Sequence, residues 1–205
     1  MKQNRITSEL ERMKRMEILI ILLTIGLVIG GIAAYMKISP SKSQLQITGD
    51  ETHFPVVSGF NLNRQEMVFP HDFKGELNLV IVAFQQSQQA MVNTWIPSAQ
   101  ELEAKIPGFI YYELPTIYEM PSFSRTFINE GMRAGIPNRT ARERTVTLYI
   151  DKEKFKSALD ISSEDEILIF LVDRDGRIYW RNSGAFTETK ASELESVLEE
   201  TQKDL

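Results

Sequence analysis

The chain of 205 residues contains no cysteine. This absence excludes a thiol nucleophile, thiol–disulfide exchange, an iron–sulfur cluster and a zinc site built on thiolates. It leaves the redox compartment open, because a protein without cysteine suits either side of a membrane.

Histidine and an excess of positive charge are also lacking. His53 and His71 are the only histidines, too few for a multi-histidine metal or haem site. The formal net charge is -5, from 23 Lys and Arg against 28 Asp and Glu, so there is no global basic field for nucleic acid. Asp173 and Asp175 flank a turn, where we expect them to bind backbone amides rather than a metal. The composition predicts no metal, no cofactor and no nucleic-acid partner.

One apolar stretch, residues 18–36, carries no charged side chain. At about 1.5 Å per residue, a helix of this length matches the ~30 Å hydrocarbon core of a bilayer. A cleaved signal peptide is the alternative, but its apolar region is about 7–15 residues long and ends in small residues. Tyr35 and Met36 stand in that place here. We interpret the stretch as an uncleaved transmembrane helix.

The charges beside this stretch predict its orientation, because basic residues are more frequent on the cytoplasmic side of a span. Those before it are Lys2, Arg5, Arg12, Lys14 and Arg15, and those after it are Lys37 and Lys42. We therefore expect residues 1–17 in the cytoplasm, residues 37–53 as a polar linker and residues 54–205 as one extracytoplasmic domain. The predicted location is a cell membrane or inner membrane, crossed once.

Within the domain, hydrophobic patterns predict strands and helices. Residues 79–84 and 167–172 are continuous apolar runs, which predict strands buried on both faces. Residues 109–114 predict another strand. Residues 145–150 alternate between apolar and polar, which predicts a half-exposed strand. Hairpins are predicted over residues 59–70 and at the Asp175-Gly176 turn. Apolar residues at helical spacing predict a helix over residues 91–106, which Pro97 is expected to bend or restart. The same spacing predicts three more helices: one at Phe123 and Phe127, one at Phe155 and Leu159, and one at Leu194, Val197 and Leu198.

This order of elements predicts an α/β fold with a mixed sheet and helices on both faces. It resembles a thioredoxin-like domain with a peroxiredoxin-style N-terminal hairpin. In redox-active relatives, the resemblance implies a cysteine where the first central strand turns into its helix and a cis-proline before a later strand. Here those places hold Gln85-Gln86-Ser87-Gln88-Gln89 and residues 163–166, so both halves of the redox site are expected to be missing.

Two interpretations of the glutamine run stay open. Gln85, Gln86, Gln88 and Gln89 form either a polar docking surface for a partner or simply a solvated helix start.

Further motifs narrow the resemblance to one family. They are YELPTI at residues 112–117, GMRAGIP at residues 131–137, and LVD at residues 171–173 followed by Gly176, Ile178, Trp180 and Gly184. They resemble the mitochondrial ATP synthase assembly factors that help to join membrane subunit a to the c-ring. The resemblance implies a chaperone-like binder of a membrane or extracytoplasmic protein, without a catalytic residue. An enzyme with non-thiol chemistry in the same cleft and a structural subunit of a membrane complex are the alternatives.

A basic cluster stands out in the acidic domain. Residues 133–144 hold Arg133, Arg139, Arg142 and Arg144 against one acid, Glu143. Gly135 and Pro137, without apolar periodicity, predict an exposed loop. Because guanidinium groups bind carboxylates and phosphates, an acidic partner surface or anionic lipid is the predicted ligand. A solvated loop paired with nearby glutamates is the alternative.

Overall fold

The computed structural model describes residues 52–204. The predicted transmembrane helix at residues 18–36 and the predicted segment 1–17 lie outside the described residues, as does the predicted linker 37–53 apart from its last two residues. No helix within the described part is long and apolar enough to cross a membrane.

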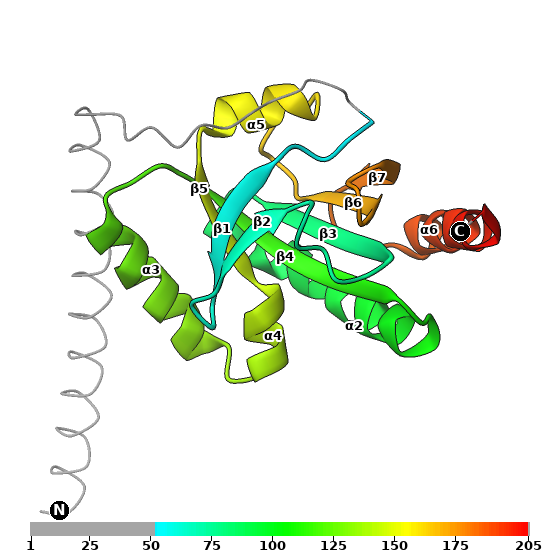
Figure 1. Ribbon diagram of the computed structural model, residues 1–205, viewed down its shortest axis with the longest axis horizontal. Helices are drawn as coiled ribbons and strands as arrows, with labels where there is room; N and C mark the ends of the chain where they lie inside the picture. The colour runs from blue at the N-terminus through cyan, green and yellow to red at the C-terminus, as the bar shows by residue number, and fades with distance from the viewer. Residues whose placement is uncertain (1–51, 205) are drawn as a thin grey trace, which may run out of the picture. The chain divides into compact units, whose positions relative to one another are not determined.

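Seven strands of the described chain form one mixed sheet in the order β2-β1-β5-β4-β3-β6-β7 (Figure 1). Strands β3, β4 and β5 are parallel, and the other neighbours are antiparallel. The mixed α/β sheet with its N-terminal hairpin is therefore confirmed. The strands are β1 (Val57–Asn61), β2 (Glu66–Phe69), β3 (Leu77–Ala83), β4 (Phe109–Tyr118), β5 (Val146–Ile150), β6 (Leu168–Asp173) and β7 (Ile178–Ser183).

Helices lie on both faces of the sheet, as the hydrophobic pattern predicts (Figure 1). The helices are η1 (Gln86–Gln88), α2 (Gln89–Lys105), α3 (Ser122–Gly135), α4 (Arg139–Arg144), α5 (Lys152–Ala158) and α6 (Glu188–Asp204). Helix α2 runs through Pro97 as one element, so the proline does not restart it.

Each face of the sheet has its own hydrophobic core. On one face, α2 and α6 pack against β3, β4 and β6. Trp95 is fully buried there and donates from Nε1 to the carbonyl of Gly184 at 2.9 Å. On the other face, the Phe54 ring meets the rings of Phe73, Phe155 and Phe170 edge-on, with centroids 5.9–6.0 Å apart. Edge-on aromatic pairs of this kind add about 0.5–1.5 kcal/mol each beyond the burial of their area.

Two glycines are required by the backbone of the sheet, one at a close strand contact and one in a turn. A Cβ at Gly59 would lie 2.4 Å from the carbonyl oxygen of Thr147, so β1 approaches β5 this closely only with glycine. Gly176 has a φ of 92° in the turn between β6 and β7. The Asp173 carboxylate accepts from the backbone N–H of Asp175 and of Arg177 at 2.9 Å each. The turn-binding role predicted for Asp173 is therefore confirmed.

Two local predictions are wrong. Strand β5 is buried along its whole length rather than half exposed, because one face packs into the core that contains Phe155 and, on the other face, the Tyr149 hydroxyl bonds to α3. The segment 133–144 is not a loop, because it contains the end of α3 and all of α4. The Asn138 side chain caps α4 by accepting from the N–H of Ala141, a capping signal that favours a helix start.

Candidate functional site

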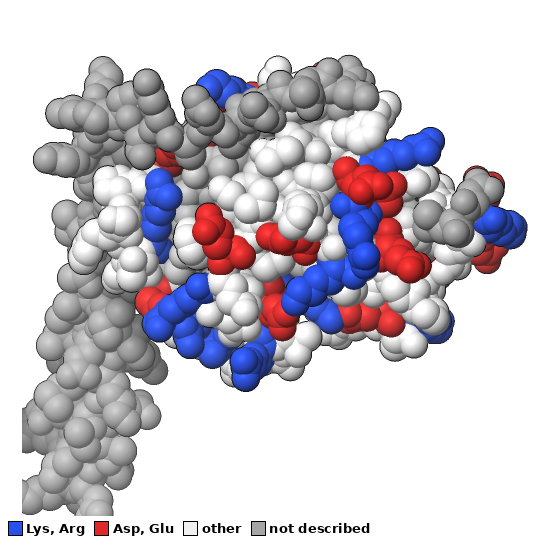
Figure 2. Space-filling view, in the orientation of Figure 1, with Lys and Arg blue, Asp and Glu red and all other residues white. Residues whose placement is uncertain are grey.

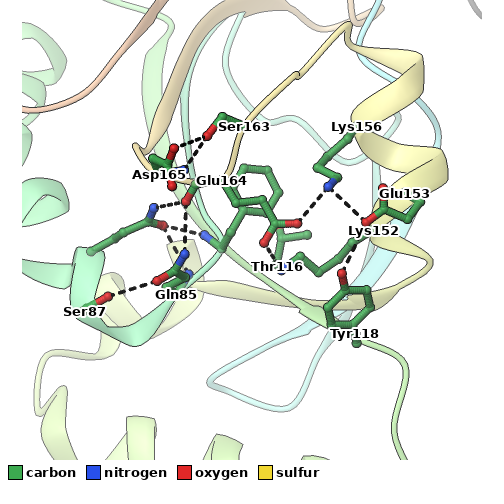
Figure 3. Close-up of polar contacts among 12 residues, drawn as sticks. Gln85, Ser87, Thr116, Tyr118, Lys152, Glu153, Lys156, Ser163, Glu164 and Asp165 are labelled. Carbon is green, nitrogen blue, oxygen red and sulfur yellow. Dashed lines mark hydrogen bonds and ion pairs between the residues drawn. The ribbon is translucent and has the colours of Figure 1, made fainter. Parts of the chain in front are cut away.

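The candidate site is the edge of the sheet where the parallel strands β3, β4 and β5 end. In open α/β sheets, ligands bind outside the carboxyl ends of such strands. Four segments meet at this edge: η1 after β3, the end of β4, the start of α5, and the loop before β6 (Figure 3). The site therefore includes the glutamine run and the segment 163–166 that the sequence singled out.

Gln88 joins two of these segments through its buried amide. Gln88 is only 2% exposed to solvent. Oε1 accepts from the backbone N–H of Phe84 at 2.8 Å and of Gln85 at 3.1 Å, while Nε2 donates to the carbonyl of Glu164 at 2.7 Å. Gln85 donates to the same carbonyl at 3.2 Å. Gln88 is thus a structural link, and it is not part of an accessible docking surface.

The other three glutamines face solvent. Gln85, Gln86 and Gln89 are exposed. Gln89 donates to Asn93 Oδ1 at 3.0 Å along α2, and it also hydrogen bonds to the side chain of Glu113. These three amides remain candidates for partner contact.

A buried ion pair fills the centre of the edge. The Lys152 side chain is 5% exposed, and its Nζ lies 2.5 Å from Glu164 Oε2. The same ammonium group lies 4.5 Å from the ring centroid of Tyr118 and 5.3 Å from that of Phe84. Lys156 holds the second carboxylate oxygen of Glu164 at 3.1 Å. Figure 3 shows both lysines converging on this one carboxylate.

The two carboxyl groups near the site respond to burial in opposite ways. Burial alone would raise the pKa of Glu164, but the hydrogen bonds from Lys152 and Lys156 outweigh it and lower that pKa below its ordinary value. Within residues 52–204, no Lys or Arg forms an ion pair with Glu113 on β4. Burial therefore raises the pKa of Glu113, and the hydrogen bond with Gln89 opposes this only in part.

The arrangement offers little for a chemical step. The ammonium group of Lys152 is already paired with a carboxylate, so it is no free amine base or nucleophile. Ser87 Oγ donates to Gln85 Oε1 at 3.4 Å, a neutral amide oxygen that does not act as a general base. Across residues 52–204, no three His, Asp or Glu side chains converge as metal ligands. An open hollow of about 640 Å³ lies beside the loop, lined by residues 160–163, Asp165, Glu166, Leu168 and residues 181–183.

The four arginines of the basic cluster divide into two pairs. Arg142 donates from Nε to the carbonyl of Ile136 at 2.5 Å and from Nη2 to that of Arg133 at 3.1 Å. Arg144 pairs with Glu103 through both terminal nitrogens and lies 4.8 Å above the centroid of the Tyr111 ring. Within the described residues, neither Arg133 nor Arg139 forms an ion pair. Figure 2 shows basic side chains gathered near the end of α3 and α4.

The Lys152–Glu164 pair was missed at the level of the sequence. Lys152 directly follows β5 and Glu164 stands in a run of acidic residues, so each has the pattern of a solvated charge. Only the fold brings them together.

With this geometry established, comparison with known proteins gives the family. The profile described as ATP10 protein matches residues 36–200. The chain belongs to the ATP10 protein family. The matched residues include nearly all of the described domain. No curated protein matches the sequence significantly.

Several solved structures are similar to this chain. The exposed lipoprotein thioredoxin Etrx1 of Streptococcus pneumoniae is 13% identical, with 70% of this chain and 98% of that chain covered and a TM-score of 0.47. A putative thiol:disulfide interchange protein DsbE of Chlorobium tepidum is 16% identical, covering 76% and 96%, with a TM-score of 0.46. A putative electron transfer protein of Aquifex aeolicus is 9% identical, covering 72% and 95%, with a TM-score of 0.48.

Proposed function

We propose that this ATP10 protein is a single-span membrane protein that binds subunits of the ATP synthase membrane sector during assembly and carries out no catalysis. The observation that carries the proposal is the family match over residues 36–200. The chain is an assembly factor in this proposal, and its domain lies outside the cytoplasm.

The filled sheet edge supports a binding role. Gln88 and Lys152 tie η1, α5 and the loop at Glu164 together, so these segments form a firm surface beside the open hollow that the loop lines. Enzyme sites are usually concave pockets with converging polar groups. A firm surface with exposed amides at Gln85, Gln86 and Gln89 suits contact with a protein client, because it loses little conformational entropy on binding.

The sequence supplies the other support. Residues 18–36 have the length and polarity of a membrane span, and the absence of cysteine removes thiol chemistry. We therefore expect the purified full chain neither to reduce insulin disulfides nor to consume peroxide. Turnover above a buffer control would count against a non-catalytic role.

Loss of the gene product gives the decisive test. In membranes of a deletion strain, the complex of subunit a with the c-ring should fall severalfold on native gels, and the full chain should restore it. Crosslinking in intact membranes followed by capture of the full chain should recover subunit a or c. Formation of the complex at wild-type level in the deletion strain would contradict the proposal.

A matched pair of variants separates the docking surface from the fold. Replacing Gln85, Gln86 and Gln89 together by Ala should reduce capture, because the exposed amides are lost while Gln88 stays in place. Replacing the exposed Glu195, Glu199 and Gln202 of α6 by Ala should leave capture unchanged. Equal capture by both triple variants would remove the glutamine surface from the proposal.

A further inference from the structure

The side of α3 that faces the domain combines polar contacts with two half-buried apolar residues, Ile128 and Met132. The Tyr149 hydroxyl donates to Asn129 Oδ1 at 2.8 Å, and the Arg125 guanidinium lies 5.4 Å from the centroid of the Tyr149 ring. No residue of α3 is buried. A helix in a soluble domain normally turns its large apolar residues toward the core, so the exposed Phe123 and Phe127 on the opposite side are the unusual feature.

A second apolar side of α3, with two phenylalanines, faces away from the domain. Phe123 is 83% exposed and Phe127 is 61% exposed. Positions spaced by three or four residues share one side of a helix, which places Gly131 and Ala134 beside the two phenylalanines. A Cβ at Gly131 would meet nothing within 4 Å. This side of α3 is therefore open at Phe123, Phe127 and Gly131.

Leaving two phenylalanines in water is unfavourable. An aromatic side chain can bury about 150–250 Å², and apolar burial contributes about 25 cal/mol per Å². A contiguous exposed apolar patch of this kind marks a contact site on a soluble domain.

The charges around this apolar side are basic or neutralised. Glu130 lies on the same side of α3, but Arg64 binds its carboxylate with Nη2 at 2.8 Å and Nε at 3.2 Å. Arg133 at the end of α3 and Arg139 at the start of α4 form no ion pair within residues 52–204. In Figure 2 the surface over the first half of α3 is largely uncharged, and basic groups follow toward α4. An apolar aromatic side bordered by unpaired arginines is the pattern of a helix that lies in a membrane interface.

The membrane in question is the one that the apolar stretch at residues 18–36 is proposed to cross. Residues 37–53 join the apolar stretch 18–36 to the domain, and a chain of this length reaches at most about 60 Å even when fully extended. Such a tether keeps α3 at high effective concentration near the bilayer. Unpaired arginines then favour the leaflet lipids that carry negative charge.

We infer that α3 lies on the anionic surface of the membrane that anchors the chain, with Phe123 and Phe127 among the acyl chains and Arg133 and Arg139 on lipid phosphates. This inference rests on the anchoring proposed above. It assigns α3 the role of orienting the domain, so that the sheet edge with Gln85, Gln86 and Gln89 is presented at a fixed height to a membrane-embedded client.

A single introduced cysteine can report this contact, because the natural chain has none. Gly131→Cys adds a side chain into open space on the apolar side of α3, and it can carry an environment-sensitive nitrobenzoxadiazole label. Gln202→Cys, exposed on α6, is the matched control position. The labelled full chain is reconstituted into vesicles of phosphatidylcholine alone, or of an equal mixture with phosphatidylglycerol.

The expected result is a severalfold rise in fluorescence at position 131 in the anionic vesicles, quenched by brominated lipid, and no rise at position 202. Phe123→Ser with Phe127→Ser, made in the Gly131→Cys chain, should abolish the rise. Arg133→Gln with Arg139→Gln should reduce it to the level in neutral vesicles. The exposed Val56→Ser change should leave it intact.

Other outcomes overturn the inference. A label at position 131 that stays in water while the protein floats with the vesicles removes the membrane role of α3 and leaves anchoring and client binding standing. An equal rise in neutral vesicles without quenching by brominated lipid shows that α3 is covered by the chain's own apolar segment. A rise that depends on the protein-to-lipid ratio shows a second copy of the chain. If the chain does not float with vesicles at all, the anchoring fails and this inference fails with it.

Discussion

The Gln88 side chain donates to the backbone carbonyl of Glu164 at 2.7 Å, across a separation of 76 residues in the chain. The bond joins the turn after β3 to the loop before β6, the two places that hold the redox site in the relatives that the sequence resembles. A glutamine can make this link because its amide accepts from two backbone N–H groups and donates to a third group at once.

Replacing Gln88 by Ala should lower the free energy of unfolding by about 2–3 kcal/mol. The change leaves the N–H groups of Phe84 and Gln85 without their acceptor and the carbonyl of Glu164 with Gln85 as its remaining side-chain donor, and each buried unsatisfied group costs about 1–3 kcal/mol before relaxation and water entry. Urea denaturation of the full chain measures the difference. The exposed Gln86→Ala change is the control, expected within about 0.5 kcal/mol of the unaltered protein, and equal effects of the two would mean that Gln88 carries no structural role.

Replacing Lys152 by Ala should cost about 2–3 kcal/mol, at or below the lower end for a broken buried pair, because Lys156 still neutralises Glu164. Lys152→Met with Glu164→Gln should recover most of the loss, since two neutral side chains of similar size then fill the same space. Chemical denaturation of both variants at neutral pH measures the two values. A double variant as unstable as Lys152→Ala would contradict this account of the pair.

The pH dependence of the same pair has a defined sign. The pKa of Glu164 is lower in the folded protein than its ordinary value, so its carboxylate contributes stability above the ordinary range of about 4.3. That contribution is lost as the pH falls through the lowered value. The stability difference between the unaltered protein and Glu164→Gln should therefore shrink from pH 6 to pH 3, as followed by thermal melting at about one-unit steps. A constant difference over this range would show that the pair is not ionic.

Glu113 should behave in the opposite way. Burial raises its pKa in the folded protein, so the folded state is favoured below the ordinary value and penalised as the pH rises through the raised one. Glu113→Gln removes that penalty and keeps an amide oxygen for Gln89. We expect a higher melting temperature than the unaltered protein at pH 8 and a smaller gain at pH 4, and a loss at pH 8 would contradict the assignment of a strained carboxylate.

The sequence predicted the positions of the strands better than it predicted which of their sides are buried. Continuous apolar runs at β3 and β6 and the Asp175-Gly176 turn depend on local residue types, and they lie where expected. β5 shows why alternation misleads: Thr147 and Tyr149 have the polar pattern of an exposed side, yet β5 is buried on both sides, because one face packs into the core that contains Phe155 and the other contacts α3. Burial of that kind depends on tertiary neighbours that no local pattern records.

The site was predicted in part, for the same reason. The sequence singled out the glutamine run as a candidate docking surface, but nothing in its sequence distinguishes Gln88, which is buried, from Gln86, which is exposed. Phe123 and Phe127 predicted a helix correctly, yet the spacing alone could not tell that α3 turns them outward. Amphipathic spacing predicts that one side of a helix is apolar, but whether that side faces the core or the solvent depends on the tertiary packing.

The basic cluster gives the last prediction, because the structure splits it into two structural and two surface arginines. Arg142→Ala and Arg144→Ala should each lower the free energy of unfolding by about 1–3 kcal/mol, since each removes charge-assisted hydrogen bonds that hold α3, α4 and α2 in place. Arg133→Ala and Arg139→Ala should stay within about 0.5 kcal/mol, as surface changes do. Urea denaturation of the four single variants measures the split, with membrane association followed in parallel. Loss of stability on Arg139→Ala, or none on Arg142→Ala, would show that the ligand-binding and structural roles are assigned to the wrong members of the cluster.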